Sequence, residues 1–321
     1  MEKVIPIIDL IETPPLYRKD YGGIRHYLSL DEDGNIVNGA ISVTSKINLA
    51  LKESQGLSDW KFNFPTKTDY KKAMNTMAYY GTIMHVVMGQ IAIGVPVMLD
   101  DNSIMKMFRL NQEQKEYGGL PEYANYSLPA EVNNTVYDCN KFRKDAIAMR
   151  VLFNDMFSKG DAEIVGIELP LANFELNMAG CLDLVIRRTK DDKVVYEIYD
   201  LKTGSGHYLS HDIQLTMYAI LLSQYLGIDR KDVNTYNIHL KDYGYDTLEK
   251  YLNGNTKTRP YIIKKVECDD TGWRMVDITY DYLYKPVDYW AKEYNFTTTP
   301  EDVISQLTEK GEDEDEPKID N

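Results

Sequence analysis

The sequence predicts a single α/β domain, in which a central mixed β-sheet is flanked by helices and preceded by a helical N-terminal portion. Strand-like apolar runs follow one another over residues 162–204, and runs of helical length lie before and after them. The 321 residues, of which 43% are hydrophobic, suffice for one large core. No internal repeat or linker is visible, so residues 1–300 are expected to form one domain with its core at about 80–245.

The N-terminal third is expected to form a β-hairpin and then helices. In "RHYLSLDEDGNIVNGAISVT" the pair Asp33-Gly34 supplies the turn between two strands. Gly94 and Pro96 end the longest of the helical runs. The helices are expected at about residues 45–54, 68–93 and 140–157.

The remainder predicts most of the sheet. Three strand-like runs come first: "AEIVGIELPL", "ELNMAGCLDLVIRR" and "KVVYEIYDLKTG". A helix over 210–227 follows, with Ser210 as its N-cap, Asp212 in its first turn and Gly227 after its end. Further strands are expected in "NTYNIHLKD", "PYIIKKVEC" and "WRMVDITY", and a last amphipathic helix near 285–294.

The charge of the chain disfavours a generic polyanion-binding protein. The net charge is −14, whereas phosphate binding is normally accompanied by an excess of Lys and Arg. Residues 309–321 alone carry −5, which leaves −9 for the other 308 residues. Residues 301–321 are therefore expected to form a disordered acidic tail, a candidate site for a protein partner. Any nucleic-acid contact of the acidic body needs a local basic patch or a bound metal.

Cysteine usage and hydropathy predict a protein of the reducing cytoplasm. Cys139, Cys181 and Cys268 lie far apart and match neither a disulfide framework nor a metal-thiolate spacing. The N-terminus shows no basic segment followed by an apolar one, so no signal peptide is expected. Residues 79–99 have the length of a membrane span, but His85 and other polar residues interrupt them, which favours a buried helix.

Asp200 and Lys202 end the run "VVYEIYDLKTG". Side chains two residues apart on a strand share one face, so the acid and the lysine are expected side by side. If this strand pairs symmetrically with "CLDLVIRR" about the turn "KDDK", Asp183 lies opposite Asp200. Like charges so placed are destabilising, and a divalent cation between them removes the conflict. An ion pair at a strand end explains Asp200 and Lys202 equally well on spacing alone.

Other types of active site fit the sequence less well. A phosphate-binding P-loop needs glycines before its lysine, whereas Gly204 and Gly206 follow Lys202. The G-x-S-x-G turn of serine hydrolases does not occur, and clustered Cys or His residues for zinc are lacking. Two acids and a lysine at one point suit hydrolysis in which a metal lowers the pKa of a water and the lysine stabilises the developing charge.

Polar residues elsewhere in the sequence widen this candidate site. Glu168 is expected on the strand before that of Asp183. Gly81 and His85 lie on a predicted helix, where a glycine costs about 1 kcal/mol relative to alanine and so suggests the close approach of another element. Gln214 and Tyr218 are four residues apart and share one face of the helix after the D-L-K strand. Each of these residues also has an ordinary structural explanation.

Together, and in this order, these elements resemble the RecB-like branch of the PD-(D/E)XK nuclease superfamily, including phage-encoded and mitochondrial genome-maintenance exonucleases. The resemblance covers roughly residues 25–220, with Leu182 at the position of the name-giving proline. It implies a restriction-endonuclease-like core. The motifs that carry it are "GTIMH" at 81–85, Glu168, "GCLD" at 180–183, "DLK" at 200–202 and "QLTMY" at 214–218, with "RHYLSL…GAISVT" before them.

The resemblance also implies roles for these residues. Lys202 would be the catalytic lysine, and Gln214 and Tyr218 would position the D-L-K strand or the nucleic-acid backbone. The cofactor would be Mg²⁺ or Mn²⁺, and a histidine ligand favours Mn²⁺. The implied metal ligands are His85, Glu168, Asp183, Asp200 and the Leu201 carbonyl, with Asp183 and Asp200 also counted as catalytic.

We therefore expect a metal-dependent DNA nuclease, more specifically an exonuclease acting on single-stranded or duplex DNA ends in replication, recombination or processing. The alternative is a non-catalytic scaffold or binding protein that retains the nuclease fold. The sequence predicts neither polarity nor oligomeric state. Basic residues that would line a DNA path are Arg25, Lys46, Lys61, Arg187, Arg188 and Lys190.

Overall fold

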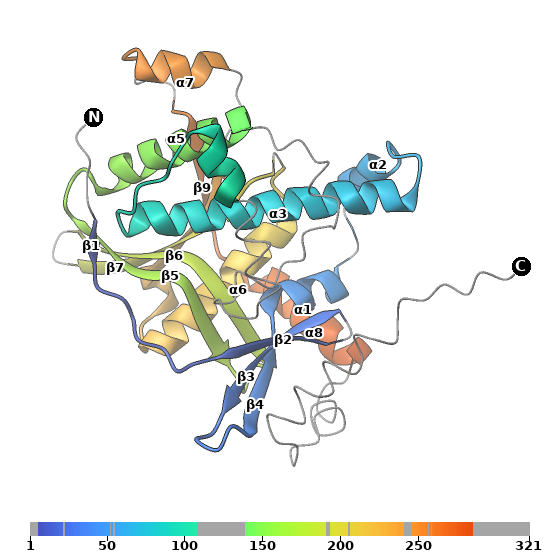
Figure 1. Ribbon diagram of the computed structural model, residues 1–321. Helices are drawn as coiled ribbons and strands as arrows, with labels where there is room; N and C mark the ends of the chain where they lie inside the picture. The colour runs from blue at the N-terminus through green and yellow to red at the C-terminus, as the bar shows by residue number, and fades with distance from the viewer. Residues whose placement is uncertain are drawn as a thin grey trace, which may run out of the picture.

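The computed structural model describes residues 6–107 and 139–284, apart from residues 22, 52, 54, 191–192, 205, 241–244, 256 and 258. Its centre is a six-stranded mixed sheet with the order β1-β5-β6-β7-β8-β9, which confirms the predicted fold class (Figure 1). Strand β1 runs parallel to β5 and β7 parallel to β8, whereas the other neighbours are antiparallel. The strands are β1 (Ile7–Ile8), β5 (Ala162–Asn173), β6 (Met178–Lys190), β7 (Lys193–Lys202), β8 (Val233–Leu240) and β9 (Tyr261–Val266).

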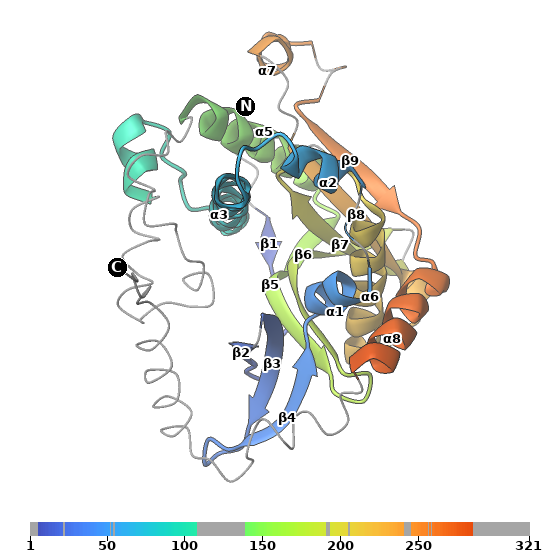
Figure 2. The ribbon, with the colours of Figure 1, turned by 90° about the vertical axis from the view of Figure 1, so that its right-hand side faces the viewer.

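Helices cover both faces of this sheet, as Figures 1 and 2 show. One apolar core joins the helices of the first face to Leu184 and Tyr199, and a second joins those of the other face to Val185 and Ile198. The first face carries α3 (Lys67–Ala92) and α5 (Cys139–Phe157); the second carries α1 (Val43–Ala50), α6 (Leu209–Leu226) and α8 (Asp270–Tyr284). The remaining named helices are α2 (Gln55–Lys61), the 3₁₀ turn Arg230–Asp232 and α7 (Tyr245–Leu252), which stands apart from the sheet in both views.

A smaller antiparallel sheet packs against the end of the β5–β6 hairpin. It consists of β2 (Tyr17–Tyr21), β3 (Ile24–Leu30) and β4 (Ile36–Ile41), in that order. A bridge between Ser42 and Ala179 and a hydrogen bond from the Ile41 N–H to Asn177 Oδ1 (3.1 Å) join it to the main sheet. Tyr27, Ala40 and Ala179 form a small buried core between the two sheets. The predicted hairpin therefore forms one wall of the main fold.

Strands β6 and β7 pair in the symmetric register that the sequence predicts. Their ladder runs from Lys190 opposite Lys193 to Leu184 opposite Tyr199. The turn residues 191–192 lie outside the described residues. The part of β6 that precedes Leu184 remains paired with β5, but it is not paired with β7. The two central strands thus separate just where Asp183 and Asp200 are placed, and this separation makes room for the candidate site.

Several other predictions are confirmed. The three long helices lie where they were expected, and Gly227 ends α6 in the left-handed conformation, with φ 66°. Residues 79–92 belong to α3, whose buried side chains include Ile83 and Val87. Within the described residues, no helix has both the length and the apolarity to cross a membrane.

Two assignments were wrong. The stretch 273–280, predicted as a strand, lies in α8, because Val276 and Tyr280 are buried one helical turn apart while Ile278 is 69% exposed. Ser210 is not the N-cap of α6: the cap is Tyr208, which makes no side-chain capping hydrogen bond. The predicted helix near 285–294 and the acidic tail lie outside the described residues.

Candidate active site

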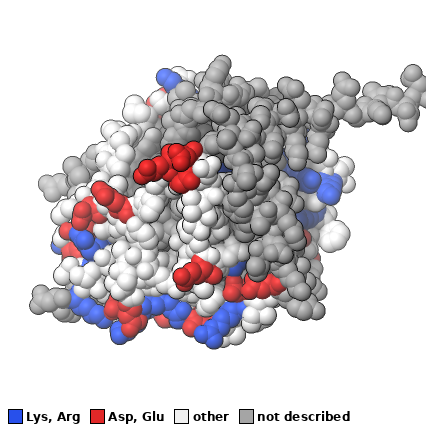
Figure 3. Space-filling model, turned by 90° about the horizontal axis from the view of Figure 1, so that it is seen from below, with Lys and Arg blue, Asp and Glu red and all other residues white. Residues whose placement is uncertain are grey.

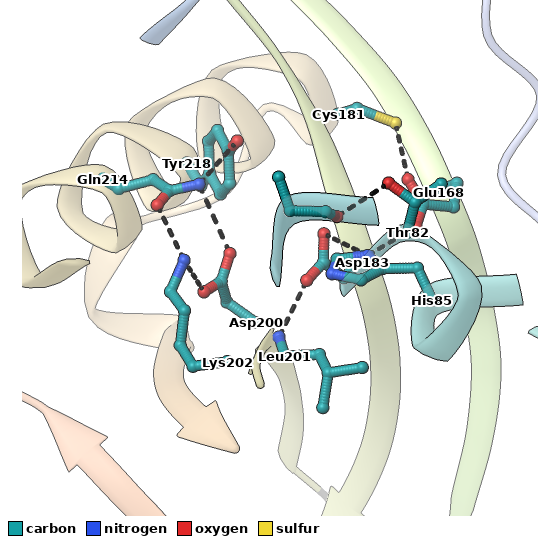
Figure 4. A network of polar contacts seen from close by, with 11 residues as sticks. Thr82, His85, Glu168, Cys181, Asp183, Asp200, Leu201, Lys202, Gln214 and Tyr218 are labelled. Atoms are coloured by element: carbon teal, nitrogen blue, oxygen red, sulfur yellow. Dashed lines mark hydrogen bonds and ion pairs between the residues drawn. The ribbon is translucent and has the colours of Figure 1, made fainter. Parts of the chain in front are cut away.

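A cavity of about 190 Å³ lies at the point where β6 and β7 separate. All of the site residues predicted from the sequence line it. They are His85 from α3, Glu168 from β5, Asp183 from β6, Asp200, Leu201 and Lys202 from β7, and Gln214 and Tyr218 from α6. A larger groove of about 730 Å³, between α6 and the β8–β9 edge, contains none of them. The polar contacts within the smaller cavity divide into two groups (Figure 4).

The first, here called the acidic group, consists of His85, Glu168 and Asp183. His85 Nδ1 lies 2.9 Å from Glu168 Oε1 and 3.5 Å from Asp183 Oδ1. The second oxygen of Asp183 accepts a hydrogen bond from the Leu201 N–H at 2.7 Å, across the gap between β6 and β7. One potential ligand atom from each of the three side chains lies within 4.8 Å of the others. This is the spacing of a group able to share one cation.

The sheet and α3 together create the acidic group. Ile167 and Leu169 pair with Leu184 and Leu182, so Glu168 lies opposite Asp183 on the neighbouring strand. The backbone of Glu168 is in the left-handed region, with φ 47°, which costs a non-glycine residue about 1–3 kcal/mol and occurs preferentially at functional sites. On α3, a Cβ at Gly81 would lie 3.3 Å from Thr203 Oγ1. The predicted close approach at this glycine is confirmed, and it brings His85 to the sheet.

The second, here called the lysine group, consists of Asp200, Lys202, Gln214 and Tyr218. Lys202 Nζ forms an ion pair with Asp200 Oδ2 and donates a hydrogen bond to Gln214 Oε1 at 3.0 Å. The Gln214 amide in turn donates to Asp200 Oδ1 at 3.3 Å and to the Tyr218 hydroxyl at 3.0 Å. Gly180 is needed beside this group, because a Cβ there would lie 2.4 Å from Tyr218 Cε1.

Burial shapes the protonation of the acidic group. Burial above all raises the pKa of the Asp183 carboxyl, and the nearby acids Asp200 and Glu168 add to this effect although His85 opposes it. Burial lowers the pKa of His85, but the charges of Asp183 and Glu168 raise it by more, so that its pKa lies above the usual range. The acidic group therefore favours positive charge, from a proton or from a cation.

The donor set fits a small divalent cation. Two carboxylates offer the hard oxygens that Mg²⁺ and Mn²⁺ prefer, and an imidazole nitrogen suits Mn²⁺. Asp200 lies outside the group with ligand atoms within 4.8 Å, and its carboxylate is ion-paired with Lys202. Leu201 contacts Asp183 through its N–H. Asp200 and the Leu201 carbonyl as metal ligands remain predictions.

Several cavity residues were not among the predicted site residues. The Cys181 thiol donates a hydrogen bond to Glu168 Oε2 at 3.3 Å, within the quoted motif "GCLD" but without an assigned role. Four others come from the smaller sheet and the start of α1: Arg18, Tyr27, Ser42 and Thr44. Apart from the family resemblance, no signal in the sequence relates the N-terminal hairpin to "GCLD", because their contact depends on how the two sheets pack.

The basic residues predicted to line a DNA path lie in different parts of the structure. Arg25 lines the cavity. Lys46 does not line a path, because it is 1% exposed and ion-paired with Asp277 at 2.5 Å. Arg187 and Arg188 are ion-paired with acids at the far end of the sheet, and Lys61 is ion-paired with Glu53. The side chain of Lys190 lies outside the described part of the structure.

The chain matches one family model, described as the PD-(D/E)XK nuclease superfamily, over residues 61–272. The matched range includes the acidic group and the lysine group, and it excludes the smaller sheet. A comparison with curated proteins gives no match.

Proposed function

Because the chain belongs to the PD-(D/E)XK nuclease superfamily, which hydrolyses phosphodiester bonds with divalent metals, we propose that it is a Mg²⁺- or Mn²⁺-dependent DNA exonuclease of the RecB-like branch. The observation that supports this most is the acidic group beside Lys202 in a single cavity. A scaffold with no catalytic function needs neither a cation-binding donor set nor a lysine next to it. We place its action at single-stranded or duplex DNA ends, in the cytoplasm of a bacterial or phage-infected cell.

In this proposal His85, Glu168 and Asp183 would hold the cation, together with Asp200. When bound, the cation would activate a water molecule and neutralise charge on the scissile phosphate. The chain's own residues do the rest. The Leu201 N–H orients Asp183, and Glu168 orients His85 through its 2.9 Å contact.

Lys202 provides the positive charge that developing negative charge on the phosphate requires. Its Nζ is fixed from two sides, by Asp200 and by the Gln214 carbonyl oxygen. Tyr218 keeps its proton, because burial and the charges of Asp200 and Asp183 raise the pKa of its hydroxyl well above the usual value. It therefore acts as a neutral partner that holds the Gln214 amide in the orientation that Lys202 and Asp200 both use.

The surface charge is consistent with a substrate that is bound locally. On the face shown in Figure 3, basic and acidic side chains are interspersed along one edge, and a few separate acidic patches lie on the otherwise uncharged described surface. The described part of this face thus offers no continuous basic track. A protein of this charge is expected to hold DNA mainly by the few nucleotides at its active site.

Incubation with end-labelled linear, nicked and circular DNA, with Mn²⁺ or Mg²⁺, tests the proposal. We expect release of short products from linear DNA and little attack on covalently closed circles. Lys202→Ala should abolish most of the release, and Arg230→Gln, a substitution in the larger groove, should not change it. Complete inactivity of the wild type with both metals, or undiminished hydrolysis by Lys202→Ala, would contradict the proposal. Cutting of closed circles would instead identify an endonuclease.

A further inference from the structure

Two arginines of the smaller sheet face the same cavity as the acidic group. Arg18 on β2 and Arg25 on β3 line it, together with Tyr27. In the β2–β3 register Arg18 is opposite Tyr27 and Asp20 is opposite Arg25. Residues that are opposite one another or two apart on a strand share one face of the sheet. One face of the smaller sheet thus presents two guanidinium groups and an aromatic ring to the cavity.

Both arginines share a carboxylate partner, Asp20, on this face of the smaller sheet. Asp20 lies 3.4 Å from Arg25 Nε and 3.8 Å from Arg18 NH2, and Asp20 itself is half exposed. The Arg18 side chain is only 8% exposed, so its guanidinium group lies inside the cavity and away from bulk water. Charge in such a place acts more strongly on a ligand than charge on the surface.

The backbone that carries Arg25 is also held in place before any substrate binds. The Arg25 N–H donates to Ser45 Oγ at 3.0 Å, and the Arg25 carbonyl accepts from the Ser42 N–H at 2.8 Å. Ser42 is bridged to Ala179 on β6, four residues before Asp183. The smaller sheet is therefore a fixed wall of the site and not a free arm. Fixed donors bind a ligand with less loss of side-chain entropy.

A phosphate group matches this arrangement best. The guanidinium fork donates two parallel hydrogen bonds to phosphate oxygens. The carboxylates of the acidic group, which line the same cavity, repel a phosphate unless a cation lies between them. An anionic DNA strand that enters the cavity therefore needs positively charged side chains to contact its phosphates. Among the cavity-lining residues within the range matched by the family model, only Lys202 and His85 can carry a positive charge.

We propose that Arg18 and Arg25 form a phosphate-binding subsite that positions the DNA strand next to the scissile bond. This inference rests on the proposed nuclease function. It assigns a substrate-binding role to the N-terminal sheet, which lies outside the range matched by the family model. The ligand is a phosphate of the substrate strand, either a terminal monoester or a diester of the backbone.

Binding of a fluorescent single-stranded DNA oligonucleotide, measured by anisotropy in EDTA so that no hydrolysis occurs, tests the subsite. Arg25→Gln and Arg18→Gln should each weaken binding by about 10-fold, as expected for the loss of a charge-assisted hydrogen bond. The slope of log K against log salt concentration should fall in magnitude by about one when the contact is lost. Calorimetric Mn²⁺ affinity should not fall in either variant, because neither arginine belongs to the acidic group.

Two arginines outside the cavity serve as matched controls. Arg188 is 18% exposed and ion-paired with Asp161 and Glu197, and Arg230 is 33% exposed and ion-paired with Asp270. Arg188→Gln and Arg230→Gln should leave DNA binding and its salt slope unchanged. Arg25→Lys, which keeps the charge and the accessible position, supplies a second variant if Arg18→Gln does not fold, and it should lose part of the affinity.

Comparing oligonucleotides with and without a terminal phosphate shows whether the arginines bind a terminal phosphate or a phosphate of the backbone. A loss of affinity confined to the phosphorylated oligonucleotide identifies a terminal phosphate, and an equal loss with both identifies the backbone. Either outcome supports the subsite. Folded Arg25→Gln and Arg25→Lys proteins that bind both oligonucleotides as tightly as the wild type would overturn it. Failure of the wild type to hydrolyse DNA would overturn the nuclease proposal but would leave the binding result readable, so the two failures are distinguishable.

Discussion

The acidic group and the lysine group share one cavity but satisfy their charges in different ways (Figure 4). In the lysine group, the charged side chains neutralise one another. Lys202 forms an ion pair with Asp200, and the Gln214 amide forms hydrogen bonds with both of them and with Tyr218. In the acidic group, two carboxylates face one imidazole, and burial raises the pKa of Asp183. The charges of the lysine group are thus compensated within the group, whereas the acidic group favours the binding of a cation.

This difference suggests a division of labour between the two walls of the cavity. The acidic group, from α3, β5 and β6, should determine whether a metal binds. The lysine group, from β7 and α6, should determine how fast a bound phosphodiester reacts. The two properties can be measured separately, by calorimetry and by kinetics, so substitutions in each group can break or sharpen the comparison.

Asp183→Asn should have the largest effect, because it removes the charge at the centre of the acidic group while preserving the size of the side chain. We expect Mn²⁺ affinity to fall by at least about 100-fold, more than the loss known for residues that only support a metal ligand. Hydrolysis should fall below detection at ordinary Mn²⁺ concentrations. Asp145→Asn is a matched control: Asp145 is equally buried, bonded to Tyr80 and Lys141, and outside the cavity. Unchanged Mn²⁺ binding by Asp183→Asn would end the assignment of the acidic group.

Lys202→Ala should separate the two groups most clearly. Removing one preorganised charge from the site of developing negative charge typically lowers kcat by about 100- to 1000-fold. Mn²⁺ affinity should not fall, because Lys202 repels a cation and its removal leaves the Asp200 carboxylate available. Single-turnover hydrolysis at saturating Mn²⁺, together with calorimetry, measures both. If Lys202→Ala lost metal binding as completely as Asp183→Asn, the division between the groups would be wrong.

The lysine group was more predictable from the sequence than the acidic group. Asp200 and Lys202 are neighbours on one strand, and the symmetric β6–β7 register places Asp183 across from them, so short-range periodicity was enough. Gln214 and Tyr218 follow from helical spacing in the next element. His85 reaches the sheet only through the docking of α3, and Glu168 depends on a left-handed backbone at that one residue. These placements arise from tertiary packing, so local sequence patterns only suggested His85 and Glu168, and the resemblance to a known family gave them roles in the predicted site.

The same limit explains what was missed. Arg18 lies on β2, a strand that the sequence did not predict, and its place in the cavity depends on the packing of two sheets through Ser42 and Ala179. The misassigned stretch 273–280 contains β-branched residues in near alternation, but packing against α1 through Val276 and Tyr280 outweighs that local preference.

Mn²⁺ should stabilise the folded protein mainly through the acidic group. A ligand that binds only the folded state adds about 2.7 kcal/mol to the free energy of unfolding at 100 times its Kd. Thermal unfolding should therefore shift upward with Mn²⁺ for the wild type and for Lys202→Ala, and should not shift for Asp183→Asn. A shift that persists in Asp183→Asn would indicate that the cation binds elsewhere.

The smallest expected effects come from one supporting residue in each group. The Cys181 thiol donates to Glu168, so Cys181→Ala should weaken Mn²⁺ binding by up to about 10-fold while leaving kcat at saturating Mn²⁺ unchanged. The Tyr218 hydroxyl accepts from the Gln214 amide, so Tyr218→Phe should lower kcat by about 5-fold, the equivalent of one ordinary hydrogen bond, and leave Mn²⁺ affinity unchanged. Both substitutions keep the apolar packing nearly intact, which makes each a test of one polar contact. The opposite pattern, with kcat responding to Cys181→Ala and metal affinity to Tyr218→Phe, would mean that the two walls act as one coupled unit.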